Sequence, residues 1–175
     1  MSNTEFPVNI SRWDPLKTWL FLVYLGTSTT PVAAVSKVSA LKRSTDVIEY
    51  REGGNPIILK GVGRTKYEPI TMERGVTFNS ELEDWANATQ VLTAGAASTS
   101  LANLRKEVSI VLLNEEGQPV HRYIVHRCWV SEFQALPDLD ANANAVAIQH
   151  IKLENEGFER DTSVVEPTEP VLTAT

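Results

Sequence analysis

The feature that most constrains the fold of this chain is a long, charged β-hairpin in its first half. From residue 47 to 52, alternation places Val47, Glu49 and Arg51 on one side of an extended strand and Ile48, Tyr50 and Glu52 on the other. Gly53-Gly54-Asn55-Pro56 then predicts a turn, and Ile57-Ile58-Leu59-Lys60 predicts a returning strand. Two interpretations are open: the hairpin docks onto another subunit, or it is a surface hairpin of a solitary β-domain.

Length and charge narrow the class of protein. A chain of 175 residues fits one domain with one core. The net charge of −6 and the scattered basic residues argue against a general affinity for nucleic acid. The apolar run at residues 19–25 is shorter than the roughly 20 residues of a membrane-spanning helix, and the polar, acidic start differs from a signal peptide. We therefore expect a soluble protein that the general secretory pathway does not export.

Alternating and apolar segments predict a mainly β chain. Gly117 and Pro119 occupy turn positions between two long strands, which indicates a second hairpin. The apolar phase of the last strand slips, which we interpret as a bulge near Gln149-His150. The strands are expected at residues 16–25, with both faces covered, and at 32–41, 70–78, 108–114, 120–133 and 146–154.

One helix is well indicated after these first strands. Ser80 and Glu83 form a capping box, in which each side chain accepts a hydrogen bond from a free backbone N–H. The buried stripe of the helix is then predicted to comprise Leu82, Trp85, Ala86 and Thr89. The Ala-, Ser- and Thr-rich segment 94–102 is expected to be a loop.

The sequence offers little material for catalysis or cofactor binding. His126 and Cys128 lie two residues apart, so a regular strand would place them on one face, but their apolar neighbours favour a buried structural thiol. The three histidines and the single cysteine match no metal-binding spacing. We expect no catalytic residue, no metal and no cofactor.

Several segments, taken in order, resemble the tube proteins of contractile phage tails and related injection systems. The first are Asp14-Pro15, residues 36–41, the hairpin at 47–56, residues 65–75 and Trp85. The later ones are residues 108–117, Trp129, residues 145–148 and residues 153–158. The chain departs from the family at Gly61-Val62-Gly63-Arg64, where many relatives carry a Pro-Gly pair, and in its extension at residues 161–175.

The strand-rich pattern with one α-helix predicts an antiparallel β-barrel or sandwich with the helix packed on it, and the resemblance narrows this to the tail-tube type. The resemblance implies a tube-type domain at residues 15–160. Composition predicts a flexible lead-in at 1–14 and an acidic, proline-containing tail at 161–175, which we expect to be disordered alone or to order only against a neighbour. The resemblance also implies a structural protein whose hexameric rings stack into a channel that carries cargo and is driven into a target by a sheath. Its partners would be itself and the sheath, baseplate and spike proteins, without membrane or specific nucleic-acid binding. Assembly would take place in the bacterial cytoplasm, and the product would form the interior of the particle.

Three other functions remain open from sequence. A paralogue of the same family could seat the tube on the baseplate, and it would differ in copy number per particle. A β-barrel of this size could instead bind a ligand in an apolar cavity, as lipocalins do. An enzyme is the third alternative, although no acid, base or metal cluster is visible in the sequence.

Overall fold

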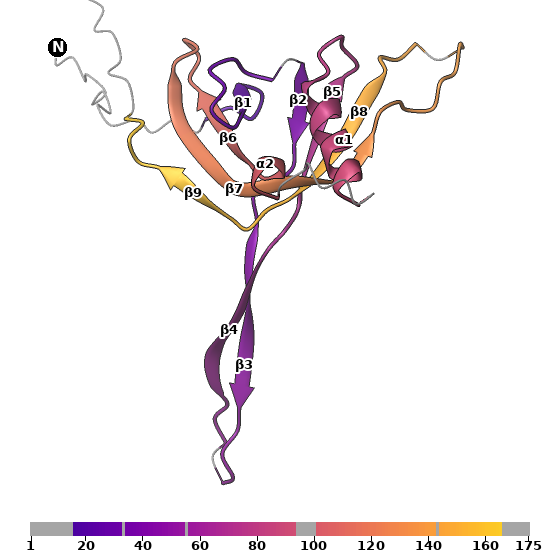
Figure 1. The fold of residues 1–175 in the computed structure, drawn as a ribbon. Helices are drawn as coiled ribbons and strands as arrows, with labels where there is room; N and C mark the ends of the chain where they lie inside the picture. The colour runs from indigo at the N-terminus through magenta and orange to yellow at the C-terminus, as the bar shows by residue number, and fades with distance from the viewer. Residues whose placement is uncertain (1–15, 33, 55, 94–100, 143, 166–175) are drawn as a thin grey trace, which may run out of the picture.

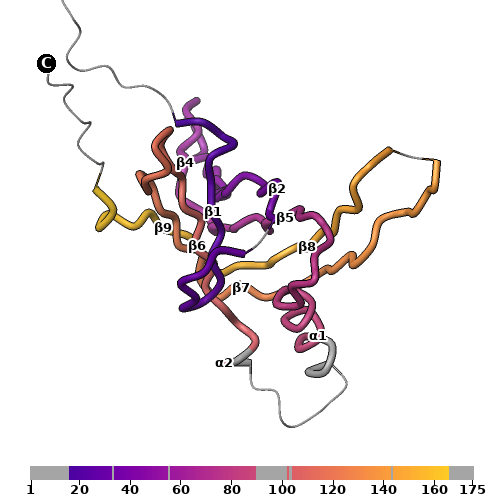
Figure 2. The backbone as a smooth tube through the Cα atoms, turned by 90° about the horizontal axis from the view of Figure 1, so that it is seen from above, coloured from indigo at the N-terminus to yellow at the C-terminus, as the bar shows by residue number. Residues whose placement is uncertain are grey.

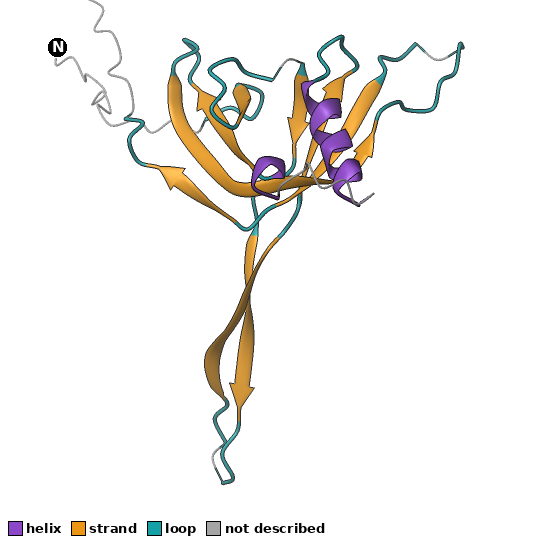
Figure 3. Cartoon of the chain, in the orientation of Figure 1, coloured by secondary structure: helices purple, strands orange, loops and turns teal. Residues whose placement is uncertain are grey.

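The structure is a computed structural model that describes residues 16–32, 34–54, 56–93, 101–142 and 144–165. It is mainly β, as predicted, with one long helix and one single-turn helix (Figure 3). The strands are β1 (Phe21–Leu25), β2 (Val35–Val38), β3 (Arg43–Tyr50), β4 (Leu59–Tyr67), β5 (Ile70–Gly75), β6 (Lys106–Leu113), β7 (Pro119–Gln134), β8 (Ile148–Glu154) and β9 (Gly157–Asp161). The helices are α1 (Glu81–Thr93) and α2 (Leu101–Leu104).

Two separate sheets divide the molecule into a body and an arm (Figure 1). The body sheet runs β1-β6-β7-β8-β5-β2, with β9 added beside β7, and every pairing is antiparallel. The arm is the two-stranded sheet β3-β4, which projects from the body. The predicted fold class is confirmed, but β1 and β2 do not pair with each other in the described chain, so the body sheet stays open.

The core lies between the body sheet and α1. The helix stripe is as predicted, because Leu82 and Trp85 are buried while Ala86 and Thr89 are half-buried. The indole N–H of Trp85 donates to the Leu104 carbonyl at 2.7 Å, which ties α2 to α1. The sheet contributes apolar side chains from most of its strands, among them Val23, Ile70, Met72, Val108, Val125, Val130, Ile151 and Leu153.

A bulge in β7 divides the body sheet into two parts. Lys106 pairs with Cys128 and Val108 with Val125, so β7 has two residues opposite the single residue Glu107. Arg127 in this bulge has a φ of 51°. On its other side, β7 pairs with β9 before the bulge and with β8 after it. The guanidinium of Arg127 contacts the Glu156 carboxylate at 3.0 Å, in the turn between β8 and β9.

Several predicted strand boundaries were wrong. The first strand begins at Phe21 rather than residue 16, and Trp19 before it is exposed. The strands expected at 32–41 and 70–78 shorten to β2 and β5, and the last predicted strand begins at Ile148. The apolar sequence pattern continued beyond the ends of the strands because loop residues such as Val32 are also buried in the core. The predicted loop at 94–102 overlaps the first residues of α2, and residues 94–100 lie outside the described chain.

The bulge predicted near Gln149-His150 is not present. Residues 148–153 of β8 pair with β5 in one uninterrupted register. The apolar phase slipped because Gln149 occupies a buried core position, where its side-chain oxygen accepts from Nε of Arg74 at 3.0 Å. Arg74 itself is 2% exposed, and burial lowers the pKa of its guanidinium.

The predicted lead-in at 1–14 lies outside the described residues, as does most of the predicted tail, from residue 166 onward. The beginning of that tail is structured. Asp161 closes β9, and its carboxylate accepts hydrogen bonds from the hydroxyl and backbone N–H of Ser163, which lower the pKa of Asp161.

Candidate assembly interface

The arm is longer than the sequence predicted. The returning strand is β4, at residues 59–67, rather than residues 57–60. Its pairing with β3 extends from Tyr50–Leu59 near the tip to Arg43–Tyr67 at the root. The predicted hairpin residues are distributed along this arm, with Glu49 and Tyr50 in β3 and Arg51, Glu52, Gly53 and Gly54 in the exposed tip. Pro56 is exposed and follows Asn55, which lies outside the described residues.

A glycine permits a bulge in the arm. The register shifts between Thr45 and Val47, where Asp46 faces two residues of β4. A Cβ atom at Gly63 would lie 2.6 Å from the Asp46 carbonyl oxygen, which is closer than real Cβ contacts allow. Only glycine therefore fits this position without movement of the arm backbone. The departure from the family pattern at residues 61–64 coincides with this bulge.

The arm exposes apolar side chains on both faces. The cross-strand pairs Ile48–Gly61 and Tyr50–Leu59 share one face, and Tyr50 is 60% exposed there. The opposite face carries Val47 and Val62, followed by the pair Glu49–Lys60. The alternation predicted for residues 47–50 is confirmed. No core of its own covers these side chains, so their exposure indicates a surface that another molecule buries.

The root of the arm is held firmly on the body. The Tyr67 ring meets the Phe158 ring edge-on at a centroid distance of 5.8 Å. The Asn155 side chain donates to the Glu68 carbonyl at 2.9 Å, and Lys42 forms an ion pair with Glu68 at 2.7 Å. The contacts of Phe158 and Asn155 join the root to β9 and to the turn before it, and the Lys42–Glu68 pair ties the two segments of the root together. The direction of the arm is therefore set by the body.

A second surface is the polar face of the body sheet. Directly paired residues share a face, which places Lys37, Glu73, His150 and Gln134 in one row. Lys37 donates to the Glu73 carboxylate at 2.8 Å and thereby lowers the pKa of Glu73. Thr71, Lys152 and Glu132 form a parallel row. This mixed-charge face lies opposite the face that carries Met72 and Ile151 into the core.

The strands of this polar face leave two edges unpaired. In the described part of the chain, β2 pairs only with β5, and residues 129–134 of β7 pair only with β8. Unpaired N–H and C=O groups along such edges are ready to extend a sheet with another chain.

The helix start has hydrogen bonds other than those of the predicted capping box. The Ser80 hydroxyl donates to the Asp84 carboxylate at 2.9 Å. The side-chain oxygen of Asn79 accepts from the Glu81 backbone N–H at 3.0 Å, so Asn79 supplies a cap. Glu83 is exposed in the first turn, together with Asp84, where negative charge favours the helix dipole.

His126 and Cys128, which the sequence places two residues apart as a possible catalytic pair, do not face each other. Cys128 is fully buried, and desolvation raises the pKa of its thiol to about 12. His126 is half-exposed, between the carboxylates of Glu107 at 3.3 Å and Glu159 at 3.2 Å. The bulge at Arg127 breaks the alternation that would have placed His126 and Cys128 on one face. Cys128 is therefore a structural residue, protonated at neutral pH.

Two searches of the described residues gave negative results. The acidic, histidine and cysteine side chains form no group of three or more that could hold a metal ion. Neither described helix is long and apolar enough to cross a membrane.

Comparison with known proteins matches this geometry to one family. Residues 17–159 match the family described as T4-like virus tail tube protein gp19. A chain in the cryo-EM structure of the anti-feeding prophage (AFP) baseplate is 27% identical with a TM-score of 0.68, over 85% of this chain and 97% of that one. A chain in the PVC sheath–tube complex of an extracellular contractile injection system is also 27% identical, with a TM-score of 0.69, over 84% and 91%. A chain in the PVC sheath/tube terminator is 26% identical, with a TM-score of 0.72, over 86% and 99%. No curated protein matches the chain.

Proposed function

Because this chain belongs to the T4-like virus tail tube protein family and is a structural inner tube protein, we propose that six copies close into a ring around a channel. Rings then stack into a tube that contraction of a surrounding sheath drives into a target. The observation that carries this proposal is the arm, because β3 and β4 bury little of their own surface and hold their apolar side chains in solvent.

The unpaired edges of the body support closure into a ring. If β2 of one copy pairs with residues 129–134 of the next, the four strands β7-β8-β5-β2 continue from subunit to subunit. Such a contact is heterologous, so repeating it generates a closed ring when the rotation fits. Closure also removes the edges that would otherwise promote uncontrolled aggregation.

The polar face of those strands suits a water-filled channel. The core face is covered within the subunit, so the face with Lys37, Glu73, Lys152 and Glu132 is the one left to line the lumen. Both signs of charge alternate across it, which favours passage of hydrated cargo over tight binding of one charge type.

The partners follow from the particles in which similar chains occur. The AFP relative comes from a baseplate structure and the PVC relative from a sheath–tube complex. We propose that this chain likewise contacts baseplate and sheath subunits, with a spike at the tip. Assembly takes place in the bacterial cytoplasm, after which the chain forms the interior of the particle.

A second candidate is a baseplate-proximal tube initiator of the same family, which the similarity to the AFP baseplate chain favours. The initiator would be present as one or two rings per particle and the main tube protein as many. Quantitative mass spectrometry of purified particles, with a sheath subunit as the internal reference, separates the two.

Negative-stain electron microscopy of the purified protein tests the proposal itself. We expect end-on views with six-fold symmetry and side views of stacked rings. A protein that remains monomeric at every concentration, even when its sheath and baseplate partners are supplied, would contradict the tube function.

A further inference from the structure

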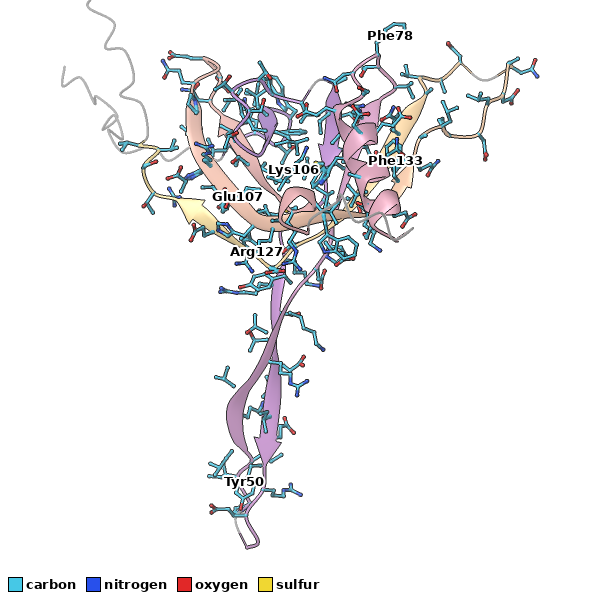
Figure 4. The ribbon with its side chains drawn as sticks, in the orientation of Figure 1. Tyr50, Phe78, Lys106, Glu107, Arg127 and Phe133 are labelled. Carbon is cyan, nitrogen blue, oxygen red and sulfur yellow. The ribbon has the colours of Figure 1, made fainter. Side chains whose placement is uncertain are left out.

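An apolar rim lies at the end of the body opposite the tip of the arm (Figure 4). We define the Phe78 rim as Val76, Phe78, Leu136, Leu139 and Val146, all of which are exposed. The Val76 backbone N–H donates to the Ala147 carbonyl at 3.0 Å, so the segment before α1 lies beside the start of β8. The connection from β7 to β8, which carries the other three residues, extends outward from this end of the body (Figure 2). The ring side chain of Phe78 is fully exposed.

The outward position of Phe78 is fixed by the buried guanidinium of Arg74. The buried side chain of Arg74 lies beneath this segment, and its guanidinium donates to the Asn79 carbonyl at 2.6 Å. The Asn79 side chain in turn accepts from the Glu81 backbone N–H. The residues on both sides of Phe78 are therefore fixed, and Phe78 is held outward in advance. A preordered aromatic side chain is the usual anchor of a protein interface, because little conformational entropy is lost when it binds.

The charge around the rim disfavours an acidic occupant. The segments that carry it, residues 76–84 and 135–147, contain five acidic residues and no basic one: Glu81, Glu83, Asp84, Asp138 and Asp140. The arm, residues 43–67, has five basic residues (Arg43, Arg51, Lys60, Arg64 and Lys66) and three acidic ones (Asp46, Glu49 and Glu52), a net charge of +2. Three of the basic residues, Arg43, Arg64 and Lys66, lie toward the root of the arm, whereas its outer part, residues 47–60, has two basic and two acidic residues. The outer arm therefore matches the rim in its exposed apolar side chains and carries no net negative charge that the acidic rim would repel.

We propose that the Phe78 rim of one copy receives the arm of a second copy. The arm and the rim lie at opposite ends of the molecule, so copies stacked in one direction bring the tip of one to the rim of the next. Contact between two different surfaces of identical chains leaves a free rim and a free arm at the two ends of every stack, which permits continued growth. This inference rests on the proposed tube function and specifies the acceptor surface for the arm.

Site-specific photo-crosslinking tests the acceptor directly. Phe78 is replaced by p-benzoylphenylalanine, which keeps the aromatic ring, and assembled tubes are irradiated and digested for mass spectrometry. We expect Phe78 to crosslink to a peptide from residues 43–67 of another copy. The same photoreactive residue at position 165 is the control, because Val165 is also exposed but belongs to neither the arm nor the rim. It should give no such peptide. Crosslinks from position 78 only to other segments, or none in well-formed tubes, would overturn the inference while leaving the tube function intact.

A truncation variant covers the case in which the photoreactive protein does not assemble. Phe78→Ala should retain the wild-type thermal unfolding temperature, because the ring has no contacts to lose, but should lower the yield of sedimentable tubes at least tenfold. Val165→Ala is the matched control and should assemble normally. Normal tube yield from Phe78→Ala would overturn the inference, whereas failure of the wild-type protein to form any ring or tube would contradict the proposed function.

Discussion

The body and the arm use similar strands in opposite ways. In the body, alternate side chains of β5 and β8 enter a core that α1 covers, so their burial stabilises the folded state. In the arm, the same alternation in β3 leaves all eight residues exposed. The difference indicates that β3 and β4 contribute surface rather than core, while the body provides the stability that holds the arm in position.

The largest stability effect is expected in the body. Trp85→Ala removes a fully packed ring and its hydrogen bond to Leu104, and should lower the free energy of unfolding by about 3–5 kcal/mol. Denaturant unfolding measures this loss. Trp19→Ala is the control, because Trp19 is mostly exposed and should change stability by less than about 0.5 kcal/mol. Equal losses at both positions would mean that Trp85 is not part of the core.

The next effect concerns the start of α1. Asn79→Ala removes the side chain that accepts from the Glu81 N–H and should cost about 1 kcal/mol in unfolding free energy. Ser80→Ala should cost less, because the Ser80 hydroxyl donates to an exposed carboxylate. If Ser80→Ala has the larger effect, the capping box predicted from sequence describes the helix better than the Asn79 cap.

In the arm, a local change should affect assembly without affecting the body. Gly63→Ala places a Cβ atom against the Asp46 carbonyl and forces β3 and β4 to shift. We expect the unfolding free energy to change by less than about 0.5 kcal/mol, because the core is untouched, while sedimentable tubes decrease. A strongly destabilised body would show that the arm is an integral part of the folding unit.

The smallest effect is expected for Cys128 near neutral pH. Since burial raises the pKa of Cys128 to about 12, the folded protein keeps its proton above pH 9, where an unfolded thiol loses it. The unfolded state therefore binds fewer protons, and stability falls as the pH rises from about 8.5 towards about 12. Below that range the contribution of Cys128 to the pH dependence should be absent. Cys128→Ala should lack this alkaline contribution in pH-dependent unfolding, and a thiol reagent should modify wild-type protein only after denaturation.

Local signals predicted much of the fold. Gly117 and the strong alternation around it gave the β6–β7 hairpin, and the apolar spacing of Leu82 and Trp85 gave the helix. The errors came from distant partners. Gln149 disturbed the expected alternation because it binds Arg74 from another strand, a pairing that no local pattern indicates.

The candidate interface was predicted only in part. The alternation at residues 47–52 indicated an arm, but Gly61 and Gly63 have low strand propensity and concealed the length of β4. The sequence predicts Phe78 at the end of a strand, and its outward position depends on the buried Arg74 behind it. Exposure of this kind follows from tertiary structure and has no signature in the sequence.

Charge reversal at the tip of the arm tests the central claim that the arm joins one copy to another. Arg51→Glu should leave the circular dichroism spectrum and thermal unfolding unchanged, because residue 51 is exposed. It should abolish tubes in electron micrographs, because like charges enforced in a contact cost several kcal/mol. Arg160→Glu, an exposed reversal on β9 outside the arm, should assemble normally. Normal tubes from Arg51→Glu would contradict the placement of this residue in the contact between copies.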